Sequence, residues 1–261
     1  MTSSEARYPS LARRLYSVWY RHMRVYARDL VSNGLPPFLE PIIFLLGIGF
    51  GLGKYVTGMQ GLPYVVFLAT AMPMTSAMFT ASYECTFGTF VRLEFSKTYE
   101  GMLAAPLTVT DLFAGELLWA GSKGFFFAAC VIAAMTAFGV APMPGSLFAP
   151  FVGALTALAF GALSLLVTSF VKNINHFNFY FTGLLSPMFF FCGAVFPLAE
   201  LPPALRYASE LLPLTHSVRL ARALAIRDFA GASVWDAAFL IVFSVAVGAL
   251  AIARLKRRII V

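Results

Sequence analysis

The chain has 261 residues, of which 59% are hydrophobic and 12% are charged, and its net charge is +7. Soluble domains carry about 25% charged residues, so this composition excludes most soluble folds and indicates a membrane protein. The Lys and Arg residues lie beside apolar segments, as in membrane proteins, and do not form the surface that a nucleic-acid partner needs. At roughly 20 residues per crossing, the length holds about six spans and no second soluble domain. We therefore expect a single all-α membrane domain over residues 1–261.

Residues 10–33 precede the first long apolar run and show an amphipathic pattern. Leu11, Leu15 and Val18 recur at helical spacing, while Arg14 and Arg21 occupy another face. The aromatic residues of this segment suit the headgroup zone of a bilayer. The pattern predicts a helix along the cytoplasmic leaflet that turns into the first span at residues 33–37. The alternative is a helix packed on cytoplasmic protein.

Long apolar runs predict six transmembrane helices. They cover residues 36–56, 63–87, 115–139, 147–171, 179–197 and 234–254. The fifth run is the weakest, because asparagines crowd its start and Pro187 interrupts it. Between the last two runs, the segment 198–233 predicts two short external helices, the first opened by Pro202 and Pro203 and the second following Pro213.

The distribution of basic residues predicts the orientation. With six spans, 13 Lys and Arg residues share the side of both termini and 5 lie on the other side. Because the more basic side of a membrane protein faces the cytoplasm, we expect both termini there.

Glycines crowd the end of the first span. Gly47 and Gly51, and likewise Gly49 and Gly53, form two overlapping GxxxG pairs. Such pairs let two helix backbones approach closely, either within one chain or across a dimer. Plain packing of small residues without a dimer explains them equally well. Lys54 follows, but the run lacks the Ser or Thr and the preceding strand of a phosphate-binding loop.

Three carboxylates lie in or beside the predicted spans, where an unpaired charge is expensive. They are Glu40, Glu84 and Glu116, and the topology predicts that all three lie near the cytoplasmic interface. Each is a candidate for the substrate path or gate, and the alternative is structural pairing with a nearby cation such as Arg21, Arg24, Arg28 or Lys123. The sequence contains no catalytic motif and no spacing of metal ligands, so we expect no catalytic and no metal-binding residue.

The order of several motifs resembles the ABC-2 family of ABC exporter permeases, in particular the branch that exports nodulation-type lipo-oligosaccharides. The matching stretches are Leu39–Pro41, Gly49–Gly53, Ala81–Phe90, Lys97–Leu107 and Gly115–Trp119, with the external segments Leu201–Pro203 and Leu212–Thr215.

The resemblance implies a multi-pass subunit of the bacterial inner membrane, of which two copies pair with two separate ABC ATPase subunits. ATP and Mg would bind to the ATPase, and this chain would bind no cofactor. In such families the loop between spans two and three, here 93–106, forms a coupling helix that sits in a cleft of the ATPase. The matching residues are Lys97, Tyr99, Glu100, Gly101, Met102 and Leu103. Tyr99, Met102 and Leu103, followed by Pro106, would form an apolar anchor; the alternative places them on the membrane surface.

The resemblance therefore implies ATP-driven export of an amphiphile, such as a glycolipid or a lipo-oligosaccharide, from the cytoplasmic side outward. Aromatic residues make up 15% of the chain and can stack on sugars and contact acyl chains. The expected partners are the ATPase, a second copy of the chain and membrane lipid. Small hydrophobic drugs are the alternative cargo. An intramembrane lipid-modifying enzyme is the alternative from another class, but it needs clustered acid, base or nucleophile groups.

Overall fold

The computed structural model describes residues 9–56, 58–228 and 232–259. Over these residues the chain is helical apart from its loops and one isolated β-bridge, Met59–Leu62. The α-helices are α1 (Leu11–Arg28), α2 (Leu30–Phe44), α3 (Tyr64–Tyr83), α4 (Thr98–Leu103), α5 (Val109–Ala137), α6 (Ala149–Phe170), α7 (Phe177–Tyr180), α8 (Ser186–Phe191), α9 (Pro203–Ser209), α10 (Pro213–Ala225) and α11 (Ala232–Ile259). The prediction of an all-α membrane protein is confirmed.

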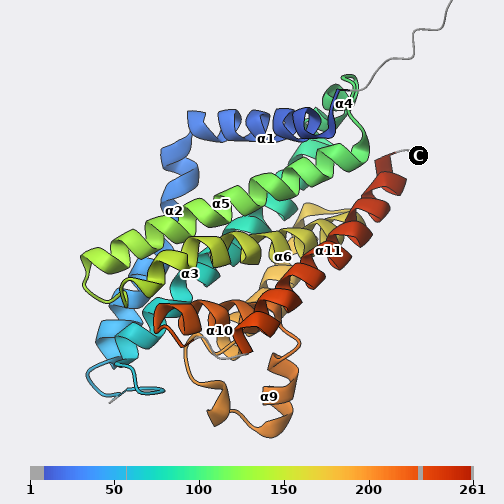
Figure 1. Ribbon diagram of the computed structural model, residues 1–261. Helices are drawn as coiled ribbons and strands as arrows, with labels where there is room; N and C mark the ends of the chain where they lie inside the picture. The colour runs from blue at the N-terminus through green and yellow to red at the C-terminus, as the bar shows by residue number, and fades with distance from the viewer. Residues whose placement is uncertain (1–8, 57, 229–231, 260–261) are drawn as a thin grey trace, which may run out of the picture.

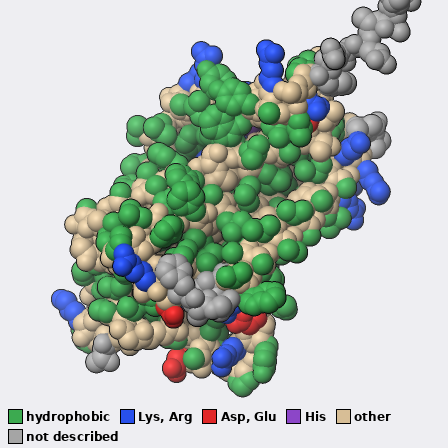
Figure 2. All heavy atoms as spheres, in the orientation of Figure 1, with side chains coloured by type: hydrophobic (Ala, Val, Ile, Leu, Met, Phe, Trp, Pro, Cys, Tyr) green, Lys and Arg blue, Asp and Glu red, His purple; other side chains and the backbone are tan. Residues whose placement is uncertain are grey.

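Five helical segments in the described part of the chain are long and apolar enough to cross a membrane. They cover Leu30–Phe50, Tyr64–Phe95, Val109–Ala137, Gly145–Phe170 and Val234–Ile259. Figure 2 shows hydrophobic side chains over the middle of the visible face, with Lys and Arg side chains toward its ends. This distribution fits a bundle whose middle lies in hydrocarbon.

The predicted span 179–197 is shorter and broken in the structure. Helix α7, a π-helical turn over Phe181–Leu185 and α8 follow one another without a gap, and the helix ends at Phe191. Phe177 packs on Phe87 near one end of the bundle, whereas Arg222 donates a hydrogen bond to the carbonyl of Gly193 near the other. The segment thus runs through much of the bundle, although it is too short for the length criterion of a span. Six spans remain a prediction.

Helix α1 lies across the end of the bundle at which α4 and the C-terminal end of α11 also lie, and α9 lies at the opposite end (Figure 1). The chain leaves the α1 helix at Asp29, whose backbone has φ −124° and ψ 41°, and α2 begins at the next residue. The predicted turn at residues 33–37 is therefore wrong. Prolines 36 and 37 lie within α2; their fixed φ is compatible with a helix, although each lacks the N–H of a helical hydrogen bond.

The docking of α1 on α5 depends on a glycine. A Cβ atom at Gly115 would lie 2.6 Å from Cβ of Val18, which is fully buried. Trp19 donates an indole hydrogen bond of 2.9 Å to Ser122, and Arg14 pairs with Asp111 at 2.5 Å. The amphipathic segment predicted from the sequence thus packs on the membrane bundle itself.

Small residues also hold α5 against α6. A Cβ atom at Gly153 would lie 2.5 Å from Cβ of Ala128, and one at Gly124 would clash with Ala157. Helices that pack without a hydrophobic drive in lipid rely on such close approach.

Both helices of the segment 198–233 are present. Helix α9 is largely exposed, whereas α10 is buried between α3, α6 and α11. Arg222 of α10 is 8% exposed and donates hydrogen bonds to Thr70 Oγ1 and to the carbonyl oxygens of Phe67 and Gly193. Those bonds join α10 to the beginning of α3.

Candidate functional site

Four charged side chains meet where α3 and α5 approach α1, and we call Glu84, Arg92, Glu116 and Lys123 the ion-pair cluster. The helix that begins with α3 continues to Phe95 through two π-helical turns, Glu84–Gly88 and Val91–Phe95. Glu116 and Lys123 are seven residues apart on α5, which places them on one face two turns apart. The ion-pair cluster thus connects one face of the helix that continues α3 to one face of α5.

Every charge in the cluster has a partner. Arg92 Nη1 lies 2.8 Å from Glu84 Oε1, and its Nε lies 3.0 Å from Glu116 Oε1. Lys123 Nζ lies 2.9 Å from Glu84 Oε2 and 4.3 Å from the centre of the Tyr26 ring. The cluster contains two carboxylates and two cations. Their pairing offsets the free-energy cost of burying charged groups in a membrane domain.

Glu116 is the most enclosed member, with 1% of its surface exposed. It accepts hydrogen bonds from the hydroxyls of Tyr99 and Thr89, the latter at 2.7 Å. His22 Nε2 of α1 lies 3.3 Å from Glu116 Oε1, the oxygen that also accepts the hydrogen bond from Tyr99. Burial raises the pKa of Tyr99 well above its ordinary value, so the hydroxyl keeps the proton that it donates. One carboxylate therefore joins α1, α3, α4 and α5.

A cavity of about 650 Å³ lies beside the cluster, between α1, α3 and α5, and we call it the α1 cavity. Arg21, Arg92 and Lys123 line it together with aromatic rings that include Trp119. The buried hydroxyl of Thr80 also lines it and has no hydrogen-bond partner among the described residues. Burial and the charge of Arg92 lower the pKa of Arg21.

The chemistry of the α1 cavity follows from this lining. Ring faces can stack on sugars, and the guanidinium of Arg21 and the hydroxyl of Thr80 can donate hydrogen bonds to oxygen-rich groups. Arg92 and Lys123 are already paired with carboxylates. The cavity therefore suits a polar headgroup, while the exposed apolar helices around it suit an attached acyl chain.

The structure separates the three predicted carboxylates. Glu84 and Glu116 share one cluster, and Lys123 is the partner of Glu84, as one of the predicted pairings states. Glu40 lies elsewhere, in the middle of the candidate span Leu30–Phe50. The helix begins at Leu30 and not at residue 36, so Glu40 does not open it, while its predicted position near the cytoplasmic interface stays a prediction.

Sequence reasoning missed Arg92 as the central cation. The predicted span ends at residue 87, which places Arg92 in a loop, whereas the helix continues to Phe95. The spacing from Glu84 to Arg92 gave only a weak signal, since residues eight apart on a regular α-helix lie about 80° apart around its axis. The π-helical turns at Glu84–Gly88 and Val91–Phe95 have more residues per turn and bring the two side chains to one face. The contacts of His22 and Thr89 with Glu116 have no signal in the sequence.

The predicted ATPase-coupling residues lie on and beside α4. Lys97, with a left-handed backbone, precedes the helix and its side chain lies 3.4 Å from Glu100. Gly101 is exposed, and Met102 and Leu103 are half-buried. Tyr99 differs from the prediction, since it is 1% exposed and its hydroxyl binds Glu116 and Arg92. It is therefore enclosed in its own chain and is not an exposed anchor.

The two glycine pairs face different ways. A Cβ atom at Gly47 or Gly51 would meet nothing within 4 Å, whereas one at Gly49 would lie 3.1 Å from Leu45 and one at Gly53 would clash with the backbone of Gly49. Gly47 and Gly51 thus mark an open face of the first span.

Comparisons with known proteins agree with this architecture. A family model described as ABC-2 type transporter matches residues 13–226. Nodulation protein J of Sinorhizobium fredii is 37% identical over 244 residues, which cover 94% of this chain and 93% of the relative. Nodulation protein J of Bradyrhizobium diazoefficiens is 34% identical, with 97% and 96% covered. The inner membrane transport permease YadH of Escherichia coli is 24% identical, with 78% and 79% covered.

The family model covers most of the chain, and the relatives match it almost from end to end. A permease of this family is a multi-pass membrane subunit that is not itself an enzyme, and the family implies an ABC ATPase partner. The chain belongs to the ABC-2 type transporter family and is a permease subunit of an ABC exporter.

Proposed function

We propose that two copies of this chain and two copies of a separate ABC ATPase form an exporter that moves an amphiphile, such as a glycolipid or a lipo-oligosaccharide, outward from the cytoplasmic side. ATP and Mg bind to the ATPase in this proposal. The permease lies in the bacterial inner membrane with both termini in the cytoplasm. The α1 cavity is the observation that carries the proposal, because it combines cations and aromatic rings for a headgroup with apolar surroundings for a chain.

The names of the relatives support a transport function and a location in the inner membrane. Two relatives are nodulation proteins and a third is an inner membrane transport permease. No observation in the described part of the chain favours small hydrophobic drugs over an amphiphile with a polar head, and the polar lining of the α1 cavity favours the latter.

A comparison of two arginines on α1 tests the cargo site. Arg21 lines the α1 cavity, whereas Arg24 is exposed and does not. In vesicles that contain the permease and its ATPase, Arg21→Gln should reduce ATP-dependent export of a labelled lipo-oligosaccharide, and Arg24→Gln should leave it unchanged. Equal export by the wild type and both variants would remove the α1 cavity from the cargo route. Export of a neutral hydrophobic dye but of no lipo-oligosaccharide would favour the drug alternative.

In this proposal the second copy of the chain packs on the open face of the first span. The first span is only 19% buried in the chain, and Gly47 and Gly51 lie on its open side. Glycines four residues apart allow close contact between helices. Gly47→Leu should therefore weaken self-association, measured by cross-linking in the membrane, while Gly183→Leu, at another glycine with nothing within 4 Å, should not.

The ATPase contact is proposed on α4. Since Tyr99 is enclosed, Met102 and Leu103 are the remaining apolar candidates, and both are half-buried beside exposed Gly101. Replacement of both by serine should leave the permease in the membrane but prevent its co-purification with the ATPase. Normal recovery of the complex, with normal stimulated ATP turnover, would contradict this contact.

A further inference from the structure

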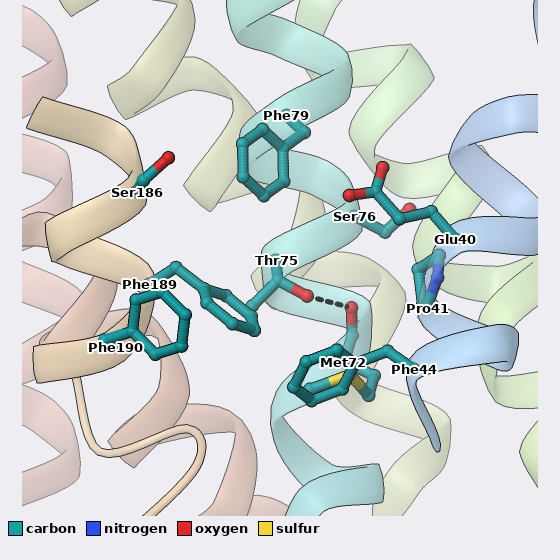
Figure 3. Close-up of a pocket in the computed structure, with 10 residues that line it drawn as sticks. All are labelled: Glu40, Pro41, Phe44, Met72, Thr75, Ser76, Phe79, Ser186, Phe189 and Phe190. Carbon is teal, nitrogen blue, oxygen red and sulfur yellow. Dashed lines mark hydrogen bonds between the residues drawn. The ribbon is translucent and has the colours of Figure 1, made fainter. Parts of the chain in front are cut away.

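Four charged side chains form a second network at the end of the bundle opposite α4, and we call it the His216 network (Figure 1). Glu210 directly follows α9, His216 and Arg219 lie on α10, and Asp236 lies in the first turns of α11. Asp236 is fully enclosed, with 0% of its surface exposed. Its surroundings differ from those of Glu40, which shares a cavity with four phenylalanine rings (Figure 3). The network therefore surrounds a buried carboxylate with hydrogen-bond donors.

Arg219 binds the carboxylates on both sides of it. Its Nε lies 2.8 Å from Asp236 Oδ2, and its Nη2 lies 2.6 Å from Asp236 Oδ1. Its Nη1 lies 2.9 Å and 3.0 Å from the two carboxylate oxygens of Glu210. A guanidinium only donates hydrogen bonds, so both oxygens of each carboxylate act as acceptors here. This geometry stabilises Asp236 and Glu210 in their ionised form.

The ring of His216 lies between two acceptors. Its Nδ1 lies 2.7 Å from Asp236 Oδ1, and its Nε2 lies 2.8 Å from the backbone carbonyl oxygen of Glu210. A neutral imidazole has one N–H and fills one of these contacts, whereas an imidazolium fills both. The charge count agrees, because two cations then balance two carboxylates. The ring also stacks on Phe239 with ring centres 3.9 Å apart, and an aromatic face attracts a cation.

We propose that His216 is a proton-binding switch that holds α11 against α10 while its ring carries two protons. Loss of either proton leaves two acceptors facing each other, at Asp236 or at the carbonyl of Glu210. It also leaves the network with one uncompensated negative charge beside the fully enclosed Asp236. Both effects oppose the contact between the two helices, so acid closes it and alkali loosens it.

The surroundings of His216 make this ring the group that decides the charge of the network. Helices α3, α6 and α8, which pack against α10, contain no Asp, Glu, Lys, Arg or His residue. Arg222 of α10 binds Thr70 of α3, and Arg206 on α9 is exposed. The like-charge contact in the network is Arg219 Nη2, 3.3 Å from His216 Nδ1, and the two carboxylates offset it.

Protons can reach the network from water. The side chains of Arg219 and Glu210 are 36% and 41% exposed, and that of His216 is 10% exposed. The proposal goes beyond the proposed function, because it needs neither a cargo nor the ATPase. Only the statement that the switch senses acidity outside the cell rests on the proposed orientation, in which this end of the bundle is external.

Solid-state NMR of the full chain in lipid, with ¹⁵N-labelled histidine, reads the protonation of the rings directly. The chain has three histidines, which are His22, His176 and His216. We expect both ring nitrogens of His216 to carry hydrogen in acid, and one of them to lose it as the pH rises from about 5 to about 9. Loss of its signals in His216→Gln assigns them, and His22→Gln with His176→Gln assigns them by elimination.

The spacing of the helices is measured on the same protein by electron spin resonance. Spin labels are attached to Leu211→Cys, next to α10, and Trp235→Cys, on α11, in a chain whose own cysteines are replaced by alanine; both positions are exposed. The distance should lengthen by at least about 2 Å over the same pH range. With His216→Gln it should not change with pH, because the amide does not titrate. His176→Gln, at an exposed histidine outside the network, should behave as the wild type.

Three results would overturn the proposal. They are a ring of His216 with a single N–H at the acid end of the range, a distance between the labels that does not change with pH, and a change that persists in His216→Gln. If His216→Gln does not yield folded protein, the two measurements on the unsubstituted ring decide the question. The distance must then change at the pH at which His216 loses its proton, and a separate midpoint would contradict the switch.

Discussion

The loss of the Arg92 side chain should destabilise the bundle. Its guanidinium contacts Glu84 at 2.8 Å and Glu116 at 3.0 Å, and its side chain is 16% exposed. Arg92→Met keeps an unbranched side chain of similar length but leaves both carboxylates without their shared cation. Glu116 suffers more, because its remaining contacts are His22 and two hydroxyls.

The size of the effect follows from this enclosure. Removal of one partner of a buried ion pair costs about 3–5 kcal/mol. Glu84 retains Lys123 at 2.9 Å, which limits its share, so we expect a loss near the lower end, about 3 kcal/mol. That energy corresponds to a change of roughly 100-fold in the ratio of folded to unfolded protein.

Unfolding in mixed micelles, followed by circular dichroism as the fraction of dodecyl sulfate rises, measures this loss. Arg92→Lys serves as the control, since it keeps the charge and loses the planar fork that binds two carboxylates, so its cost should be smaller. Arg92→Met combined with Glu116→Gln should recover part of the loss, by about 1 kcal/mol or more, because the stranded charge is gone.

Two results would refute this reasoning. One is an unfolding curve of Arg92→Met that coincides with the wild type. The other is strict additivity of the two substitutions, which would mean that Arg92 and Glu116 do not interact energetically although their side chains are in contact.

Three further predictions concern other parts of the chain. Glu84→Gln should assemble with the ATPase normally and lower the unfolding free energy by about 3 kcal/mol, because Lys123 loses its carboxylate partner. It should also reduce cargo export in reconstituted vesicles, because Glu84 lines the α1 cavity; unchanged export beside a lowered melting temperature would assign it to structure alone. Gly115→Leu should displace α1, because a side chain there would meet Val18, and should raise the thiol labelling of Val18→Cys; unchanged labelling would contradict the docking. In intact cells, impermeant thiol reagents should label a cysteine at Arg206 and not one at Lys172, and the reverse would overturn the orientation.

The contact between α4 and the ion-pair cluster became visible only in the structure. Tyr99 has the sequence pattern of an exposed apolar anchor, because the residues after it are Met102, Leu103 and Pro106. In the folded chain its hydroxyl reaches Glu116, 17 residues further along. Sequence spacing cannot show such a contact, since it depends on how the loop after Phe95 folds back on α5.

Composition and hydrophobic runs by themselves determined that this chain is an all-α membrane protein, because the cost of unpaired polar groups in lipid leaves few other solutions. They also located four of the long helices to within several residues, and the carboxylates as candidates. Tertiary structure decided the partners of Glu84 and Glu116, the different faces of the two glycine pairs and the place of Glu40 within its helix. Each depends on the exact start of a helix, on π-helical turns that rotate its face or on a contact between distant segments, and a hydrophobic run contains none of this information.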